Sequence, residues 1–121
     1  MVKALFDTNI LIDYLNAVPE ARNELRRYES KSISLVTWME VLVGAAPDRE
    51  AATRSFLGTF EVLNIDRSVA ERAVELRRSL RIRLPDAIVW ATAQVHASLL
   101  VTRNTKDFPA DHPGVYVPYR L

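Results

Sequence analysis

Short apolar runs that alternate with longer segments of helical spacing are the feature that most restricts how this chain can fold. The runs end in charged or small polar residues, and they predict a series of short strands. Apolar positions three and four residues apart predict helices between them. Strands separated by helices predict an α/β layered fold around a mostly parallel sheet. The expected strands are residues 3–6, 32–36, 61–65, 99–102 and 115–117. The expected helices are residues 9–15, 20–29, 37–46 and 47–59, a long arginine-rich helix, and residues 85–97.

Local signals predict where the last two helices begin. Ser68 is expected to cap the arginine-rich helix, and Glu71, three residues later, would complete a capping box. Pro85 is suited to the first position of the following helix. That helix is apolar on nearly every side, so we expect it to be buried and Trp90 to lie in the core.

The composition is that of an ordinary globular protein. A length of 121 residues is enough for one core, so residues 1–121 are expected to form a single domain. No apolar run is long enough to cross a bilayer, and the N-terminus has no signal-type pattern. The chain has no cysteine, which excludes disulfides and thiolate metal sites. These properties are typical of a cytoplasmic protein.

The positive charge is carried mainly by arginine. The chain has three lysines and thirteen arginines, and six of the arginines fall within residues 67–83. A solvated helix face is one interpretation of this segment. A patch for an anionic polymer is the other, because arginine makes bidentate contacts with phosphate.

Acidic residues recur where strands are expected to end and helices to begin. Asp7 follows the first strand, Glu40 follows the second, Asp107 follows the fourth, and Asp86 lies at the start of the buried helix. Ligands of parallel sheets bind outside the carboxyl ends of the strands. The four acids therefore lie where a site would be expected.

Each acid also has a structural interpretation. Asp7 and Asp86 suit helix N-termini, Glu40 would complete a capping box with Thr37, and Asp107 could cap or be solvated. Several carboxylates in one partly buried crevice repel one another, and a cation would resolve that repulsion. Oxygen ligands favour Mg²⁺, with Mn²⁺ as the alternative, and the two histidines do not have the spacing of a zinc site. An acidic metal site flanked by arginine describes a phosphodiester nuclease.

Four motifs resemble those of PIN-domain ribonucleases, in particular the VapC-type toxins of type II toxin–antitoxin systems. They are FDTNILIDYL at residues 6–15, TWMEVLVGA at 37–45, PDAIVWATA at 85–93 and LVTRNTKDF at 100–108, and together they span most of the chain in the family's order. The resemblance implies a three-layer α/β/α sandwich with a mostly parallel central sheet. It also implies an acidic cluster that binds Mg²⁺ or Mn²⁺ and cleaves RNA.

The resemblance assigns roles to individual residues. The metal-binding and catalytic acids would be Asp7, Glu40, Asp86 and Asp107, and the supporting polar residues would be Thr8, Asn9, Thr102 and Asn104. Asp7 and Asp86 are expected to be the most direct ligands, while Glu40 and Asp107 could act through water. Asn104 stands where many relatives carry a further acid, so one metal ion and two both stay open.

The resemblance also implies partners. Such toxins cleave RNA, form homodimers and are held inactive by a cognate VapB-type antitoxin. The RNA target cannot be named from these motifs, and transfer, ribosomal and messenger RNA are all compatible with them.

Three alternatives compete with this interpretation. A haloacid-dehalogenase-type phosphatase would need an acid at position 9, which is Asn9, and a suitably placed lysine. A structure-specific DNA nuclease would need inserted elements for which the chain has no room. A non-catalytic PIN-like binding module would keep the acids only for packing. Two further expectations concern Asp13, which would join an N-terminal hydrogen-bond network, and the pair Arg103 and Lys106, which are candidate phosphate contacts.

Overall fold

A parallel sheet forms the centre of the molecule. The structure is a computed structural model that describes residues 2–121. In this range five strands pair in the order β3-β2-β1-β4-β5, and every pairing is parallel. The α/β prediction is therefore confirmed. The strands are β1 (Ala4–Phe6), β2 (Lys31–Ser34), β3 (Glu61–Leu63), β4 (Leu99–Val101) and β5 (Val115–Tyr116).

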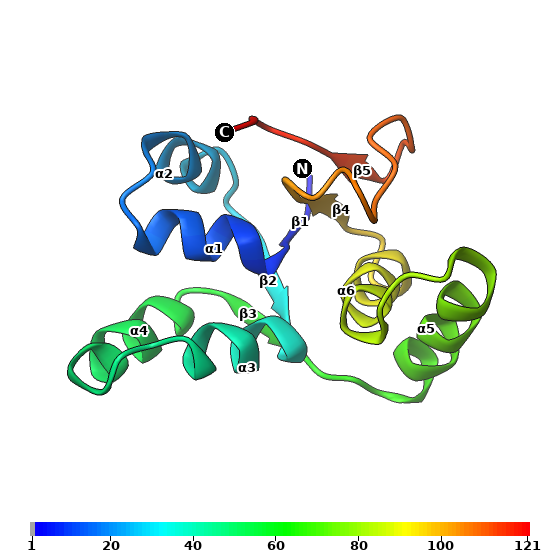
Figure 1. Ribbon diagram of the computed structural model, residues 1–121, viewed down its shortest axis with the longest axis horizontal. Helices are drawn as coiled ribbons and strands as arrows, with labels where there is room; N and C mark the ends of the chain where they lie inside the picture. Colours follow the sequence, from blue (N-terminus) through cyan, green and yellow to red (C-terminus); the bar gives the residue numbers. More distant parts are fainter. Residues whose placement is uncertain (1) are drawn as a thin grey trace.

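Helices cover both faces of this sheet, as expected for a three-layer sandwich. One face carries α1 to α4 and the other carries α5 and α6, as Figure 1 shows. Among the described residues, none of the helices is long and apolar enough to cross a membrane. The helices are α1 (Thr8–Leu15), α2 (Pro19–Arg26), α3 (Leu35–Val43), the 3₁₀ turn η1 (Pro47–Arg49), α4 (Glu50–Leu57), α5 (Arg67–Leu80) and α6 (Leu84–Val95).

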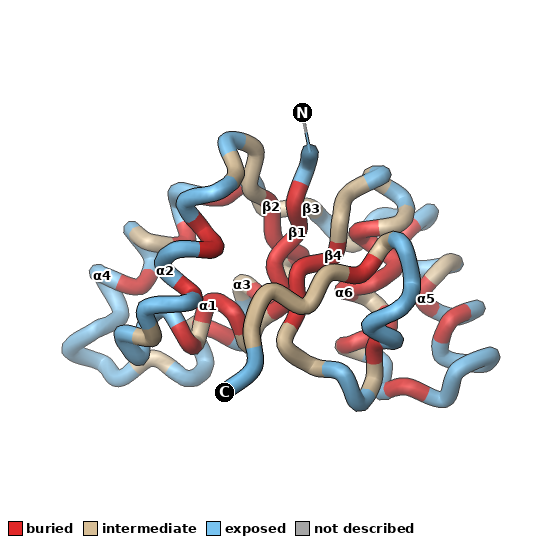
Figure 2. The backbone as a smooth tube through the Cα atoms, turned by 90° about the horizontal axis from the view of Figure 1, so that it is seen from above, coloured by how far each residue is buried: buried red, intermediate tan, exposed pale blue. Residues whose placement is uncertain are grey.

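Strand β1 lies in the middle of the sheet and is apolar on both sides. Ala4 and Phe6 pack among the side chains of α1 to α4, whereas Leu5 packs among those of α5 and α6. All three residues are fully buried, as the red central strands in Figure 2 show. Such a strand reads as a continuous apolar run because helices cover both faces. Its carboxyl end therefore opens into the middle of the protein.

Helix α6 is buried along most of its length, as its apolar sequence predicts. Trp90 is only 3% exposed, which confirms its expected place in the core. Its ring makes edge-to-face contacts with Phe108 at 5.6 Å and with His112 at 5.3 Å between ring centroids. These contacts hold the loop between β4 and β5 against α6.

The junction between β2 and α3 differs from the expectation that Thr37 opens the helix. Strand β2 ends at Ser34, whose hydroxyl caps α3 by accepting from the Val36 N–H at 3.1 Å. Thr37 is buried inside the helix, so it makes no capping box with Glu40. The apolar pair Leu35 and Val36 is compatible with strand or helix, and the cap at Ser34 decides the outcome.

The start of α5 also corrects the sequence prediction. The N-cap is Asp66, whose Oδ1 accepts from the Val69 N–H at 2.9 Å, and Ser68 lies within the first turn. Aspartate and serine are equally good caps, so the sequence alone does not choose between them. The capping box expected between Ser68 and Glu71 does not form.

A buried carboxylate joins α1 to the loop after β4 and to the C-terminal segment. Asp13 accepts from Arg103 Nε at 2.7 Å, from Arg103 Nη2 at 2.9 Å and from the Tyr119 hydroxyl at 2.8 Å. Asp13 thus joins a hydrogen-bond network, but its partners lie in the C-terminal part of the chain and not near the N-terminus, where the network was expected. The guanidinium of Arg103 is engaged with a buried partner, which leaves Lys106 as the freer of the two candidate phosphate contacts.

Replacing the observed cap of α5 tests the corrected helix start. We expect Asp66→Ala to lower the free energy of unfolding by about 1 kcal/mol, because the Val69 N–H loses its acceptor. Ser68→Ala should change it by less than about 0.5 kcal/mol, since an alanine suits a helix interior. Urea denaturation of both variants gives the comparison, and a larger loss for Ser68→Ala would contradict the observed cap.

Removing the buried carboxylate tests the Asp13 network. Asp13→Ala leaves the Arg103 guanidinium and the Tyr119 hydroxyl without their shared acceptor, so we expect a loss of about 2–3 kcal/mol in unfolding free energy. The exposed residue Asp48 provides the control, and Asp48→Ala should stay within about 0.5 kcal/mol of the parent protein. Equal stability of the two variants in urea denaturation would show that the network contributes nothing.

Candidate active site

Asp7 lies where the central strand ends and α1 begins. Its backbone N–H still donates to the Val101 carbonyl at 2.9 Å, next to the β1–β4 pairing. Its side chain caps α1, and Oδ1 accepts from the Thr8 N–H at 2.8 Å. The helix-cap interpretation is therefore correct as geometry, but it uses only one of the two carboxylate oxygens.

The second oxygen of Asp7 is held by residues from two segments. Oδ2 accepts from the Thr102 hydroxyl at 2.7 Å and from Asn9 Nδ2 at 3.1 Å. Asn9 in turn accepts at its Oδ1 from the Arg103 N–H at 3.1 Å. The carboxylate is thus fixed in orientation, and Asp7 is only 4% exposed.

Glu40 reaches the same region from α3. Its Oε1 accepts from the Thr8 hydroxyl at 2.7 Å, and Thr8 Oγ1 also lies 3.0 Å from Thr37 Oγ1. Unlike Asp7, Glu40 is exposed to solvent. Thr8 therefore links the buried carboxylate, through its backbone, to the exposed one, through its hydroxyl.

Asp86 approaches from the first turn of α6 and is 7% exposed. Its Oδ2 accepts from Arg83 Nε at 3.1 Å, and the Arg83 side chain is itself 75% exposed. Burial raises the pKa of Asp86, and the hydrogen bond and charge of Arg83 partly oppose that increase. An exposed cation thus stands at the edge of the acidic group.

These side chains line one cavity of about 300 Å³ at the carboxyl end of β1. The structure brings three of the four expected acids into it, together with three of the four expected supporting residues. The lining residues are Asp7, Thr8, Asn9, Ile12, Glu40, Arg83, Asp86, Arg103 and Asn104. Thr102, the fourth expected supporting residue, does not line the cavity but donates a hydrogen bond to Asp7, which does.

Asp107 is placed differently from the other three acids. It lies in the loop after β4 and accepts from Asn104 Nδ2 at 3.0 Å. Asn104 lines the acidic cavity, whereas Asp107 lines a neighbouring hollow. Its charge still raises the pKa of Asp86, so Asp107 lies at the rim of the group within electrostatic range.

The buried carboxylate carries an unfavourable charge. Burial is the main cause that raises the pKa of Asp7 to about 6, and the nearby charges of Asp86 and Glu40 add to the increase. The hydrogen bonds from Thr102 and Thr8 act in the opposite direction. Negative charge concentrated in this way favours a bound cation.

The donor set suits a hard divalent cation. Asp7, Glu40 and Asp86 offer carboxylate oxygens, the ligands that Mg²⁺ and Mn²⁺ prefer. Within residues 2–121, however, no three acidic or histidine side chains converge closely enough to form a complete ligand cage. Mg²⁺ commonly keeps several waters and uses one or two carboxylates, so this open arrangement fits a hydrated ion.

The sequence did not predict that Arg83 pairs with Asp86 or that the Thr37 side chain contacts Thr8. Arg83 was counted only among the basic residues of the arginine-rich segment. Its spacing of three residues from Asp86, with Pro85 in the first helical turn, is the signal that could have identified the pair. Thr37 offered no such signal, because its contact with Thr8 depends on how α1 and α3 pack.

Comparison with known proteins places this geometry in a family. The family model described as "PIN domain" matches residues 4–110, and the chain belongs to the PIN-domain family. It is 31% identical over 113 residues to Ribonuclease VapC10 of Mycobacterium tuberculosis, with 87% of this chain and 85% of that protein covered. The family resemblance expected from the four motifs is thus confirmed.

Solved structures agree with the fold. A toxin–antitoxin complex from Klebsiella pneumoniae contains a chain that is 51% identical, with a TM-score of 0.93 and coverage of 98% of this chain and 100% of that one. The DNA-bound VapBC structure from Salmonella typhimurium matches at 26% identity, with a TM-score of 0.79 and coverage of 96% of both chains. The likeness therefore extends over nearly the whole chain.

The raised pKa of Asp7 predicts how stability depends on pH in the presence of chelator. The native state binds its proton up to about pH 6, whereas the unfolded chain releases it near 3.8, so Asp7 lowers stability as pH rises through that interval. Asp7→Asn removes this charge. We compare the unfolding free energy of the variant with that of the parent at two pH values. The difference should favour the variant by about 2 kcal/mol more at about pH 7.5 than at about pH 4.5.

Urea denaturation of both proteins at the two pH values measures this difference. The asparagine side chain also fails to reproduce a hydrogen bond of Asp7. The free-energy cost of that loss is the same at both pH values, so it cancels in the comparison. The exposed residue Asp111 supplies the control, and Asp111→Asn is measured at the same two pH values. A pH-independent effect of Asp7→Asn would mean that the carboxylate titrates normally.

Proposed function

We propose that the chain is an endoribonuclease that depends on Mg²⁺ or Mn²⁺, acts as the toxin of a toxin–antitoxin pair, and hydrolyses RNA phosphodiester bonds. The observation that carries the proposal is the buried Asp7, which shares one cavity with Asp86 and Glu40 at the carboxyl edge of a parallel sheet. The proposal treats residues 1–121 as one nuclease domain. Its relatives include a ribonuclease and a chain of a toxin–antitoxin complex, and these names support the same activity.

Asp7 and Asp86 are proposed to hold the metal ion directly, and Glu40 and Asp107 to act through water or from the rim. A bound ion of this kind supplies a water of lowered pKa and neutralises charge on the attacked phosphate. The side chains around it then have separate tasks. Three donors hold the Asp7 carboxylate in one orientation: the Thr102 hydroxyl, the Asn9 amide and the Thr8 N–H. The carboxylate can therefore bind a metal ion without a change of rotamer.

Glu40 is the acid best placed to accept a proton. It is exposed, and the Thr8 hydroxyl fixes its Oε1 at the cavity that holds Asp7 and Asp86. A general base needs a defined position in the site and a free lone pair, and the hydrogen bond from Thr8 leaves Glu40 with both. Arg83 lines the same cavity, and the guanidinium N–H groups that Asp86 does not use are suited to hold a phosphate oxygen.

Asn9 counts against the phosphatase alternative. Its side-chain amide donates a hydrogen bond to Asp7 Oδ2 at 3.1 Å. An amide does not gain or lose a proton at ordinary pH, so Asn9 cannot act as a general acid or base. A phosphatase of that kind would need an acid or base at this position. The structure-based role of Asn9 is to orient Asp7, which agrees with the nuclease proposal.

The proposed partners follow from the family. We propose that a VapB-type antitoxin binds the chain and inhibits it, because related chains occur in toxin–antitoxin complexes. RNA is the proposed substrate, and the cytoplasm is the proposed place of action. Homodimerisation stays a prediction, which the oligomeric state in solution would test.

Single substitutions in the acidic cavity test the catalytic proposal. Asp7→Asn and Asp86→Asn should each lower the rate of RNA cleavage at least about 100-fold, since losses of 10–100-fold already follow when residues that only support metal ligands are changed. Excess EDTA should abolish cleavage by the parent protein, and added Mg²⁺ or Mn²⁺ should restore it.

Cleavage of a labelled RNA by purified protein measures these rates. Asp111→Asn, which changes an exposed acid outside the cavity, should cleave at the parent rate. Circular dichroism confirms that each variant is folded. Full activity of both cavity variants, together with resistance to EDTA, would sink the proposal.

A further inference from the structure

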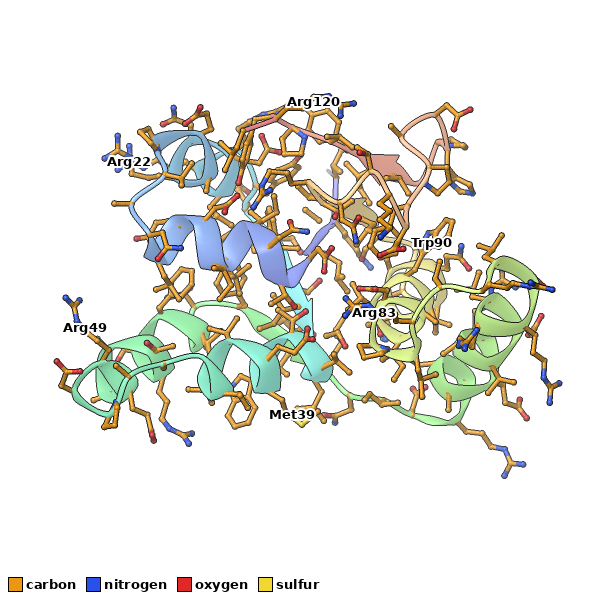
Figure 3. The ribbon with its side chains drawn as sticks, viewed as in Figure 1. Arg22, Met39, Arg49, Arg83, Trp90 and Arg120 are labelled. Atoms are coloured by element: carbon orange, nitrogen blue, oxygen red, sulfur yellow. The ribbon has the colours of Figure 1, made fainter. Side chains whose placement is uncertain are left out.

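A second hollow lies beside the acidic cavity, between α5, α6 and the loop that joins β4 to β5. Its volume is about 680 Å³, which is within the range of small-molecule and nucleotide sites. In Figure 3 the labelled Trp90 marks the part of α6 that faces this loop. The lining includes Arg72, Arg81, Trp90, Lys106, Asp107 and His112.

One short loop separates the two hollows. Asn104 lines the acidic cavity, Asp107 lines the second hollow, and the two side chains are hydrogen bonded at 3.0 Å. Asn104 Oδ1 also accepts from the backbone N–H groups of Lys106 and Asp107, which keeps this loop tight. The two hollows are therefore neighbours on the surface, separated only by the side chains and backbone of this loop.

The second hollow offers cations that have no partner in the protein. Throughout residues 2–121, no hydrogen bond or ion pair engages the side chain of Arg81 or Lys106. Arg72, by contrast, donates to Gln94 at 2.6 Å and to Glu75 at 3.3 Å, and so helps to form the wall. The two free cations are available to an anionic ligand.

The backbone conformation of Arg81 makes glycine a suitable replacement at this position. Arg81 ends α5 with φ 56° and ψ 27°, in the left-handed region. Glycine or asparagine adopts this conformation with less strain, so the backbone alone would favour either of them.

His112 adds an N–H donor to the same wall. Its Nδ1 accepts from the Gly114 N–H at 2.9 Å, so a neutral ring carries its proton on Nε2. The ring packs edge-on against Trp90, which is buried and therefore rigid. The hollow thus combines an apolar floor with N–H donors, a combination suited to a base and its phosphate.

We propose that this hollow binds a nucleotide of single-stranded RNA adjacent to the cleaved phosphodiester, with Arg81 and Lys106 in contact with backbone phosphates. The proposal rests on the proposed ribonuclease function and adds a substrate subsite to it. Single-stranded RNA suits the site because an unpaired base can turn into a hollow, whereas a paired base cannot.

The double variant Arg81→Gly and Lys106→Ala tests the subsite. Binding of a fluorescein-labelled single-stranded RNA is measured in EDTA, where cleavage does not interfere, at several salt concentrations. Loss of two phosphate contacts should weaken binding about tenfold or more at low salt, and should reduce the slope of log K against log salt by about 1.4. Glycine at position 81 suits the left-handed backbone, so the melting temperature of the Arg81→Gly single variant should not fall.

A matched control removes two positive charges elsewhere. Arg22 and Arg26 lie on α2, and Figure 3 shows the labelled Arg22 on the side of the molecule away from Trp90. Arg22→Ala with Arg26→Ala should leave the affinity and the salt slope close to those of the parent. Equal losses in the two double variants would overturn the subsite, because they would show a general effect of net charge.

Two further outcomes separate this proposal from others. If the parent protein cleaves RNA and the Arg81 and Lys106 variant binds and cleaves it equally well, the subsite is wrong and the ribonuclease proposal stands. If that variant keeps RNA binding but loses binding of the purified antitoxin, the hollow belongs to the protein partner, which also overturns the subsite. A parent protein that neither binds nor cleaves RNA would overturn both proposals together.

Discussion

The buried carboxylate of Asp7 is the constraint on which the rest of the site depends. It stands at the carboxyl end of the central strand, where both faces of the sheet are covered by helices. Three donors, the Thr8 N–H, the Thr102 hydroxyl and the Asn9 amide, hold its two oxygens. These donors reduce the cost of burial but do not remove it, since the pKa of Asp7 is still raised to about 6. A carboxylate that is fixed in orientation and unfavourably charged is prepared to bind a cation.

The charges around Asp7 also favour a bound cation. Asp86 and Glu40 add negative charge to the cavity, and the exposed Arg83 offsets part of it through its ion pair with Asp86. Beyond Asn104, the balance changes to positive at Arg81 and Lys106. Acidic residues in the cavity and free cations beside it suit a metal ion next to a polyanion. Membership of the PIN-domain family agrees with that arrangement.

The large features of the fold could be predicted because they arise from local patterns. Apolar runs indicated the strands, and an apolar segment after Pro85 indicated the buried helix α6. Two errors fell at helix starts, where Asp66 rather than Ser68 caps α5 and Ser34 rather than Thr37 precedes α3. Others fell at element ends, since α2 ends at Arg26 and β3 at Leu63, before the residues 29 and 65 that were expected. Several residues within two or three positions are equally able to cap a helix, so packing of the whole element decides between them.

The sequence by itself determined that acids follow the ends of strands, because the order of elements and their apolar periodicity are written locally in the chain. Only the tertiary structure decided which acids meet. Thr102 holds Asp7 across 95 residues because β4 lies beside β1, and strand order is not a local property. The same packing brings Arg103 into contact with Asp13 and places Asp107 at the rim of the acidic cavity. Side chains that come from distant segments acquire their partners only when the sheet assembles, and this is why motifs could suggest the site but could not give its geometry.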